Sequence, residues 1–89
     1  MKAIVTVVGK DQVGIIAAVC VKLAEYNVNV LDISQTVMQG YFTMMMVVDV
    51  SNSSAPVAEL VKIMEEKGRE MGLSIRVQRE DIFEAMHRV

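Results

Sequence analysis

The chain is poor in the residues that most catalytic and metal sites require. Its 89 residues include one cysteine, one histidine, one proline, four aromatic side chains and no tryptophan. A single cysteine cannot form an internal disulfide, and one cysteine with one histidine cannot complete a zinc site. This usage fits a reducing compartment, so we expect a cytoplasmic protein with no metal and no cofactor.

The chain also lacks an excess of basic charge and a long apolar run. Its net charge is −2, which gives no electrostatic basis for binding nucleic acid or an acidic membrane surface. No apolar run approaches the roughly 20 residues of a membrane span, and the first residues do not have the shape of a signal peptide. We therefore expect neither a nucleic-acid partner nor a membrane partner.

Hydrophobic residues, in contrast, are abundant, at 53% of the chain. The length suits a single domain, residues 1–89, whose core must be modest. Such a small core cannot bury this much apolar surface. The composition therefore predicts that a second copy covers part of it, in a homodimer or a higher homo-oligomer.

The first half of the chain alternates strand and helix patterns. Residues 3–8 predict a buried strand rich in valine and isoleucine, and apolar residues then recur at helical spacing from Ile15 through Val19 and Leu23. This helix is expected to end near residues 26–27. Two strands follow, over 28–38 and 41–50, and Gly40 between them indicates a hairpin turn.

The second half repeats the order helix, then strand. Pro56 suits a first helical turn, the apolar spacing continues to Met71, and Gly72 suits the end of a helix. Residues 73–78 alternate as a strand, and residues 81–88 predict a short final helix. The order β-α-β-β-α-β predicts an α+β, ferredoxin-like fold. Its four-stranded antiparallel sheet would carry both main helices on one face, leaving a bare face suited to self-association.

This fold has many functions, so the residues must decide between them. An RNA-binding version needs aromatic side chains on the open face, and the first strand has none. A soft-metal carrier needs paired cysteines in the loop over residues 9–14, and a phosphatase of this fold needs an arginine there; the loop has neither. Cys20 lies in the apolar stripe of the first helix, and no nucleophile, acid and base converge. We therefore expect that the protein is not an enzyme.

The loop between the first strand and the first helix is the best candidate site. A helix N-terminus exposes unpaired N–H donors and partial positive charge, which suit a carboxylate. Asp11 is expected to cap this helix, and Gly14 leaves room for a ligand. A carboxylate would lie on the N–H groups of residues 13–15, and Asp11 or Asn29 would hold an ammonium group. An amino acid carries both groups.

These residues resemble an ACT domain, the small-molecule sensor module of amino-acid metabolism. The resemblance is carried by residues 11–15 after the first strand, the Asn-Val-Asn-Val entry to the second strand, and Gln35 before the Gly40 turn. The chain is most similar to free-standing, single-domain ACT proteins, which resemble one module of the glycine-cleavage regulator. Many members have a proline where this chain has Val13.

The resemblance implies a dimer with sheets joined edge to edge and a ligand bound between modules. Its ligand residues map to Asp11, Gln12, Val13, Gly14 and Ile15 in the loop and to Asn29 on the second strand. The function expected is non-catalytic regulation by an amino acid, with the signal passed to a separate protein partner. The alternative is a ligand-free dimeric adaptor.

Overall fold

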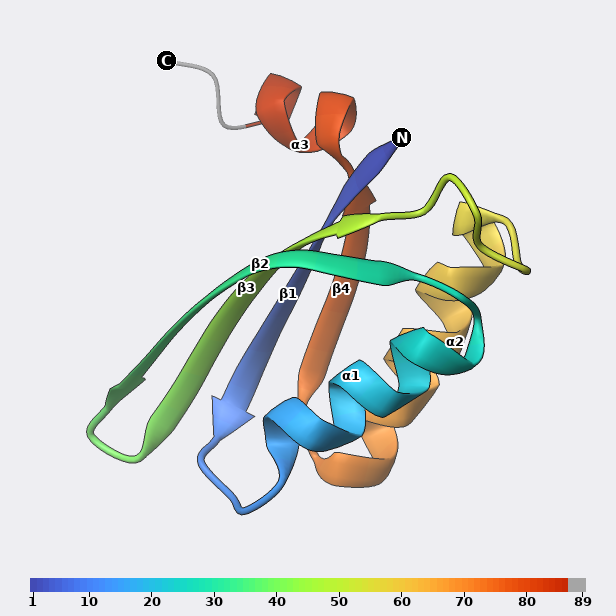
Figure 1. Cartoon of the computed structure of the whole chain (residues 1–89). Helices are drawn as coiled ribbons and strands as arrows, with labels where there is room; N and C mark the ends of the chain where they lie inside the picture. The colour runs from blue at the N-terminus through green and yellow to red at the C-terminus, as the bar shows by residue number, and fades with distance from the viewer. Residues whose placement is uncertain (87–89) are drawn as a thin grey trace.

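The computed structural model describes residues 1–86 as a sheet with two long helices on one side (Figure 1). Each predicted element is present near its predicted place. The final helix begins one residue earlier than predicted, and residues 87 and 88 of the predicted span lie outside the described part. In chain order the elements are β1 (Lys2–Lys10), α1 (Ile15–Glu25), β2 (Asn29–Met38), β3 (Tyr41–Asp49), α2 (Val57–Met71), β4 (Ser74–Arg79) and α3 (Glu80–Met86).

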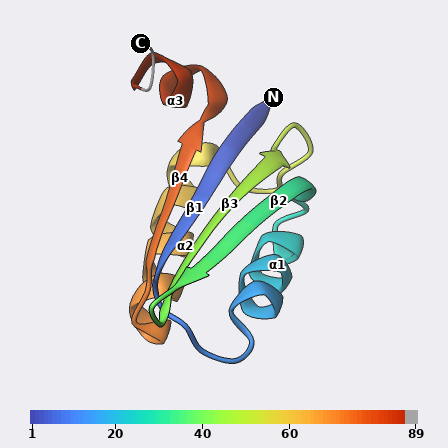
Figure 2. The same ribbon diagram turned by 90° about the vertical axis from the view of Figure 1, so that its left-hand side faces the viewer.

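The four strands form one antiparallel sheet in the order β2-β3-β1-β4. Both long helices cover the same face, as Figure 2 shows from the side of the sheet. This confirms the predicted ferredoxin-like arrangement. Gln39 and Gly40 join β2 to β3 with positive φ angles of 53° and 81°. Two left-handed residues are typical of the hairpin turn whose twist matches that of the flanking strands.

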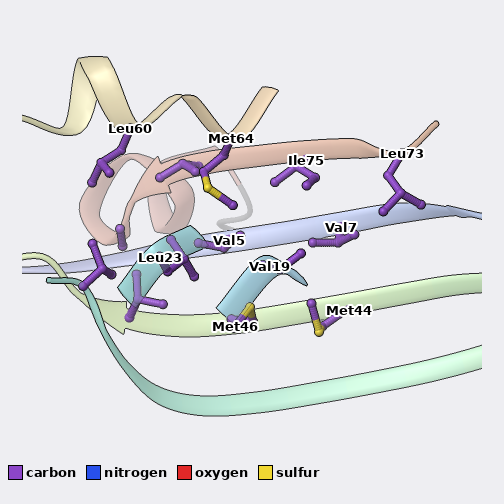
Figure 3. Close-up of a cluster of buried hydrophobic side chains, with 14 of the residues drawn as sticks. Val5, Val7, Val19, Leu23, Met44, Met46, Leu60, Met64, Leu73 and Ile75 are labelled. Atoms are coloured by element: carbon purple, nitrogen blue, oxygen red, sulfur yellow. The ribbon is translucent and has the colours of Figure 1, made fainter. Parts of the chain in front are cut away.

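The core lies between the helices and the three strands β3, β1 and β4. Alternate side chains of these strands point toward the helices and are buried. Figure 3 shows them packed against the apolar stripes of α1 and α2. The largest fully buried side chains are Leu23, Met44, Met46, Leu60, Met64, Val5, Val7, Val19 and Val48.

Gly68 in α2 has a packing role that the sequence pattern did not indicate. It is buried, and a Cβ added there would lie 2.6 Å from the carbonyl oxygen of Leu73. Glycine thus lets the helix approach the start of β4. Four residues later Gly72 ends the helix with φ of 70°, as predicted, and its N–H donates to the carbonyl of Arg69.

The short helix α3 covers one end of the sheet face that α1 and α2 leave open. It follows Arg79, which pairs with Ala3, and it contacts both β1 and β4. Ile4, whose side chain lies on the open face, is only 7% exposed and is separate from the main core. Toward the β2–β3 turn the open face is bare, as predicted, and Met38 and Met45 are exposed there.

Candidate functional site

The loop between β1 and α1 consists of residues 11–14 and ends in a left-handed glycine. Gly14, with φ of 86°, occupies the N-cap position of α1, and no side chain caps this helix end in the described part of the chain. The prediction that Asp11 caps the helix is therefore wrong. Asp11 lies three residues before the N-cap position, and its backbone N–H donates to the carbonyl of Gly40 at 2.8 Å. This bond joins the loop to the β2–β3 turn.

The uncapped helix leaves N–H donors available at its first turn. The Ala18 N–H donates to the carbonyl of Gly14, so the ladder of helical hydrogen bonds begins there. The N–H groups of residues 15–17 precede it and have no intrahelical partner. Together with the helix dipole they favour a negatively charged group at this end of α1.

This end of α1 opens onto a surface hollow of about 410 Å³. The hollow brings together four of the predicted loop residues with the end of β2. Val13 does not line it, because this side chain is completely exposed at the tip of the loop. The residues that line it are Asp11, Gln12, Gly14, Ile15, Ile16, Ala17, Gln35, Thr36, Val37 and Phe42.

The sequence did not predict that residues of β2 and β3 line this hollow, although the alternation of side chains in β2 was a usable signal. Register pairs Val37 with Phe42 and Gln35 with Met44. Since Phe42 and Met44 are buried under the helices, Gln35 and Val37 lie on the same face of the sheet. The alternation in β2 already grouped Gln35 with Val37, but only the fold brings them beside the loop.

The side chain of Gln12 joins the loop to the end of α2. Its side-chain amide donates to the backbone carbonyl of Met71, 2.9 Å away, at the last residue of α2. A helix leaves its last carbonyls without intrahelical partners, so this bond satisfies one of them. The amide nitrogen of Gln12 thus has a structural role, and the residue also lines the hollow.

Asn29 is not brought to the loop within one copy of the chain. It lies at the start of β2, whereas the loop adjoins the end of β2. There it lines a second, polar hollow of about 350 Å³, together with Ala24, Asn27, Val28, Asp49 and Asn52. The pKa of Asp49 is held below its ordinary value, chiefly by hydrogen bonds from Ser51 and also by the N-terminal ammonium group at 3.5 Å.

The outer edge of β2 is free of any pairing strand in the described structure. The N–H of Ile33 donates to the carboxylate of Asp32 at 2.9 Å, so it points away from β3. The helix-facing side chains of this strand are also uncovered, with Ile33 39% and Val37 55% exposed. Apart from the Ile33 N–H, which the Asp32 carboxylate accepts, this edge has backbone groups and apolar side chains available to another chain.

Cys20 is half-buried against the core, and the methionine run at 44–46 divides, with Met44 and Met46 inside and Met45 on the other face. Over residues 1–86 no three acidic, histidine or cysteine side chains gather as they would around a metal ion. None of the helices described has the length and apolar content to cross a membrane.

Comparison with known proteins identifies this architecture. Residues 2–78 match the ACT domain family. The chain belongs to the ACT domain family. Within it, a UPF0237 protein of Bifidobacterium longum is 56% identical over 88 residues, which cover 99% of this chain and 98% of the relative. The match therefore spans almost the whole length of both chains.

Solved structures agree with the assignment. An ACT domain protein from Streptococcus pneumoniae is 48% identical and superposes with a TM-score of 0.83 over 98% of each chain. A putative glycine cleavage system transcriptional repressor has the same fold, with a TM-score of 0.74 at 21% identity. The comparison covers 88% of this ACT chain and 44% of the repressor, in keeping with the predicted likeness to one module.

Proposed function

We propose that this ACT domain is a non-catalytic regulatory protein that binds an amino acid at the first turn of α1. The observation that carries the proposal is the uncapped helix N-terminus opening onto a hollow with Asp11 among its lining residues. The ligand carboxylate would accept from the N–H groups of residues 15–17, two residues further along than the sequence suggested. Its ammonium group would lie against the Asp11 carboxylate.

The hollow is open on the side of β2, and a second copy of the chain would complete it. Two β2 edges related by a two-fold axis run antiparallel, so the start of one strand lies beside the end of the other. This places the Asn29 backbone of the second copy near the end of β2 that adjoins Asp11, while the Asn29 side chain, paired in register with Asp49, belongs to the face away from the helices. The exposed Ile33 and Val37 would be covered by the same contact. The ligand would then stabilise the dimer by contacting both copies.

Regulation is supported by the family and by the fold neighbour whose name describes a repressor. The domain contains no converging nucleophile, acid and base among its described residues. Ligand binding can alter the interaction with a partner protein only if the ligand favours one arrangement of the two copies over another. We also propose that the protein acts in the cytoplasm, where it would pass an amino-acid signal to a separate protein.

The test is a thermal-shift screen of the purified protein against the common amino acids. A ligand present at a hundredfold excess over its dissociation constant stabilises the folded state by about 2.7 kcal/mol. We expect a clear rise in melting temperature for one or a few amino acids. The rise should be lost in Asp11→Ala and kept in Glu65→Ala, which removes an exposed carboxylate from α2 instead.

Absence of any shift, with the dimer intact, would overturn the sensor and favour the ligand-free adaptor. A shift that survives Asp11→Ala would place the ligand elsewhere on the protein.

A further inference from the structure

The open face of the sheet divides its charged side chains between two halves. The pairing of the strands arranges the side chains that point away from the helices in rows, and each row runs across the sheet from β2 through β3 and β1 to β4. The acidic residues of this face lie on β2 and β3, and the basic residues lie on β1 and β4. The acids are Asp32 and Asp49, and the bases are Lys2, Lys10 and Arg76.

Apolar side chains accompany these charges at the end of the face near the β2–β3 turn. They are Val8, Met38, Tyr41 and Met45, which are 43%, 68%, 58% and 42% exposed. The opposite end is occupied by α3, which contacts β1 and β4 there. The bare part of the face is thus a contiguous, partly apolar patch with charges of both signs around it.

We propose that this face docks onto the same face of a second copy, about a two-fold axis that runs parallel to the strands between β1 and β3. Such an axis places β3 over β1 of the other copy and β2 over β4. It therefore sets the acidic half of each face against the basic half of the other. An interface between identical patches requires this kind of self-complementarity.

The register makes the pairing specific. Ser34, Met45, Thr6 and Arg76 form one row across the face, and Asp32 lies in the neighbouring row. About this axis Arg76 of the second copy faces Ser34 and has Asp32 as its nearest acid. Lys10 faces the ring of Tyr41 in the second copy, an arrangement that favours a cation–π contact.

The other axis that stacks the two faces is perpendicular to the strands, and charge disfavours it. That axis lays each strand over its own counterpart with the rows reversed. When this axis crosses the strands at the Thr6 row, Arg76 faces Arg76 of the second copy and Lys10 faces Lys2. Like charges set against each other oppose association, so the charge pattern selects the parallel axis.

Other occupants fit this face less well. A nucleic acid or an anionic membrane requires a predominantly basic surface, whereas this face mixes both signs on a chain of net charge −2. The helix α3 brings Glu80, Asp81 and Glu84 to the far end, where Asp81 is paired with Arg79 at 2.7 Å. The complementarity therefore rests on Asp32, Lys10 and Arg76, away from α3.

This contact is separate from the β2 edge used in the proposed function. Ile33→Pro blocks the edge: the Ile33 N–H is bonded to the Asp32 carboxylate rather than to β3, so proline leaves the β2–β3 ladder intact and also frees this carboxylate. With both contacts available the protein should associate beyond a dimer without closing, because two stacked copies have their β2 edges on opposite sides. With the edge blocked it should form a dimer through the open face.

The decisive experiment uses sedimentation velocity to measure the association of charge-exchange variants. The variants are made first in the Ile33→Pro protein and then in the wild-type protein. Arg76→Glu and Asp32→Lys should each weaken association at least tenfold, and the double variant Asp32→Lys/Arg76→Glu should restore it. Lys62→Glu reverses a charge on the exposed side of α2 and should change nothing. Circular dichroism melting of each variant establishes that it is folded.

The proposal would be overturned if the wild-type protein is no larger than a dimer and the Ile33→Pro protein is a monomer. That result would leave the edge dimer in place. Failure of the double variant to regain the association lost in the single variants would also overturn it.

Discussion

The side-chain amide of Gln12 and the backbone carbonyl of Met71 are 2.9 Å apart, although 59 residues separate them in the sequence. This hydrogen bond ties the loop of the candidate site to the end of α2. The same end of α2 continues through Gly72 into β4. The shape of the ligand hollow therefore depends on how the second half of the chain packs against the first.

Removing this bond should loosen the loop without unfolding the domain. Gln12→Ala is expected to lower the free energy of unfolding by about 1 kcal/mol, because an exposed hydrogen bond contributes little net stability. Amide exchange of residues 11–17 should increase by a larger factor than exchange in β4. Unchanged exchange in the loop would contradict a positioning role for Gln12.

Gly68 should resist the substitution that usually strengthens a helix. In an open helical position Gly→Ala stabilises by roughly 0.5–1 kcal/mol. Here the added methyl meets the Leu73 carbonyl oxygen at 2.6 Å, so Gly68→Ala should instead destabilise by about 1–3 kcal/mol. Chemical denaturation measures the sign directly, and a stabilised variant would show that α2 can move away from β4 at little cost.

The sequence predicted the fold well because apolar periodicity, turn glycines and helix ends all agree with one another. It did not predict the role of Gly68, because close approach of a helix to a strand is a tertiary contact. It placed Asp11 at the helix cap because local spacing cannot reveal that Gly14 takes that position. Gln35 and Val37 entered the site only through the pairing of β2 with β3.

Two valines on α1 provide a matched test of where the core lies. Val19 is fully buried, whereas Val21, two residues along the same helix, is 60% exposed. Val19→Ala should lower the free energy of unfolding by about 2 kcal/mol through lost burial and the cavity left behind. Val21→Ala should be neutral or slightly stabilising, because alanine is the better helix former. Equal losses in denaturation experiments would contradict the packing of α1 described above.

The pKa of Asp49 predicts a dependence of stability on acid pH. Its hydrogen bonds from Ser51 and the N-terminal ammonium group lower the pKa in the folded state below the ordinary value of about 3.9. The stabilisation is therefore fully present above pH 4 and is lost as the pH falls through the lowered pKa. Asp49→Asn should flatten the fall in melting temperature below pH 4. A fall as steep as that of the wild type would assign the acid sensitivity to other carboxylates.

An NMR titration of the ¹⁵N-labelled protein with the amino acid that gives the largest thermal shift is the most direct test of the proposed site. Binding at the hollow predicts saturable shifts of the amides of residues 11–17 and 35–42, which are absent in Asp11→Ala. Asn29 should shift with them if the second copy completes the site. Saturable shifts confined to other surfaces, or none with any amino acid, would contradict the account.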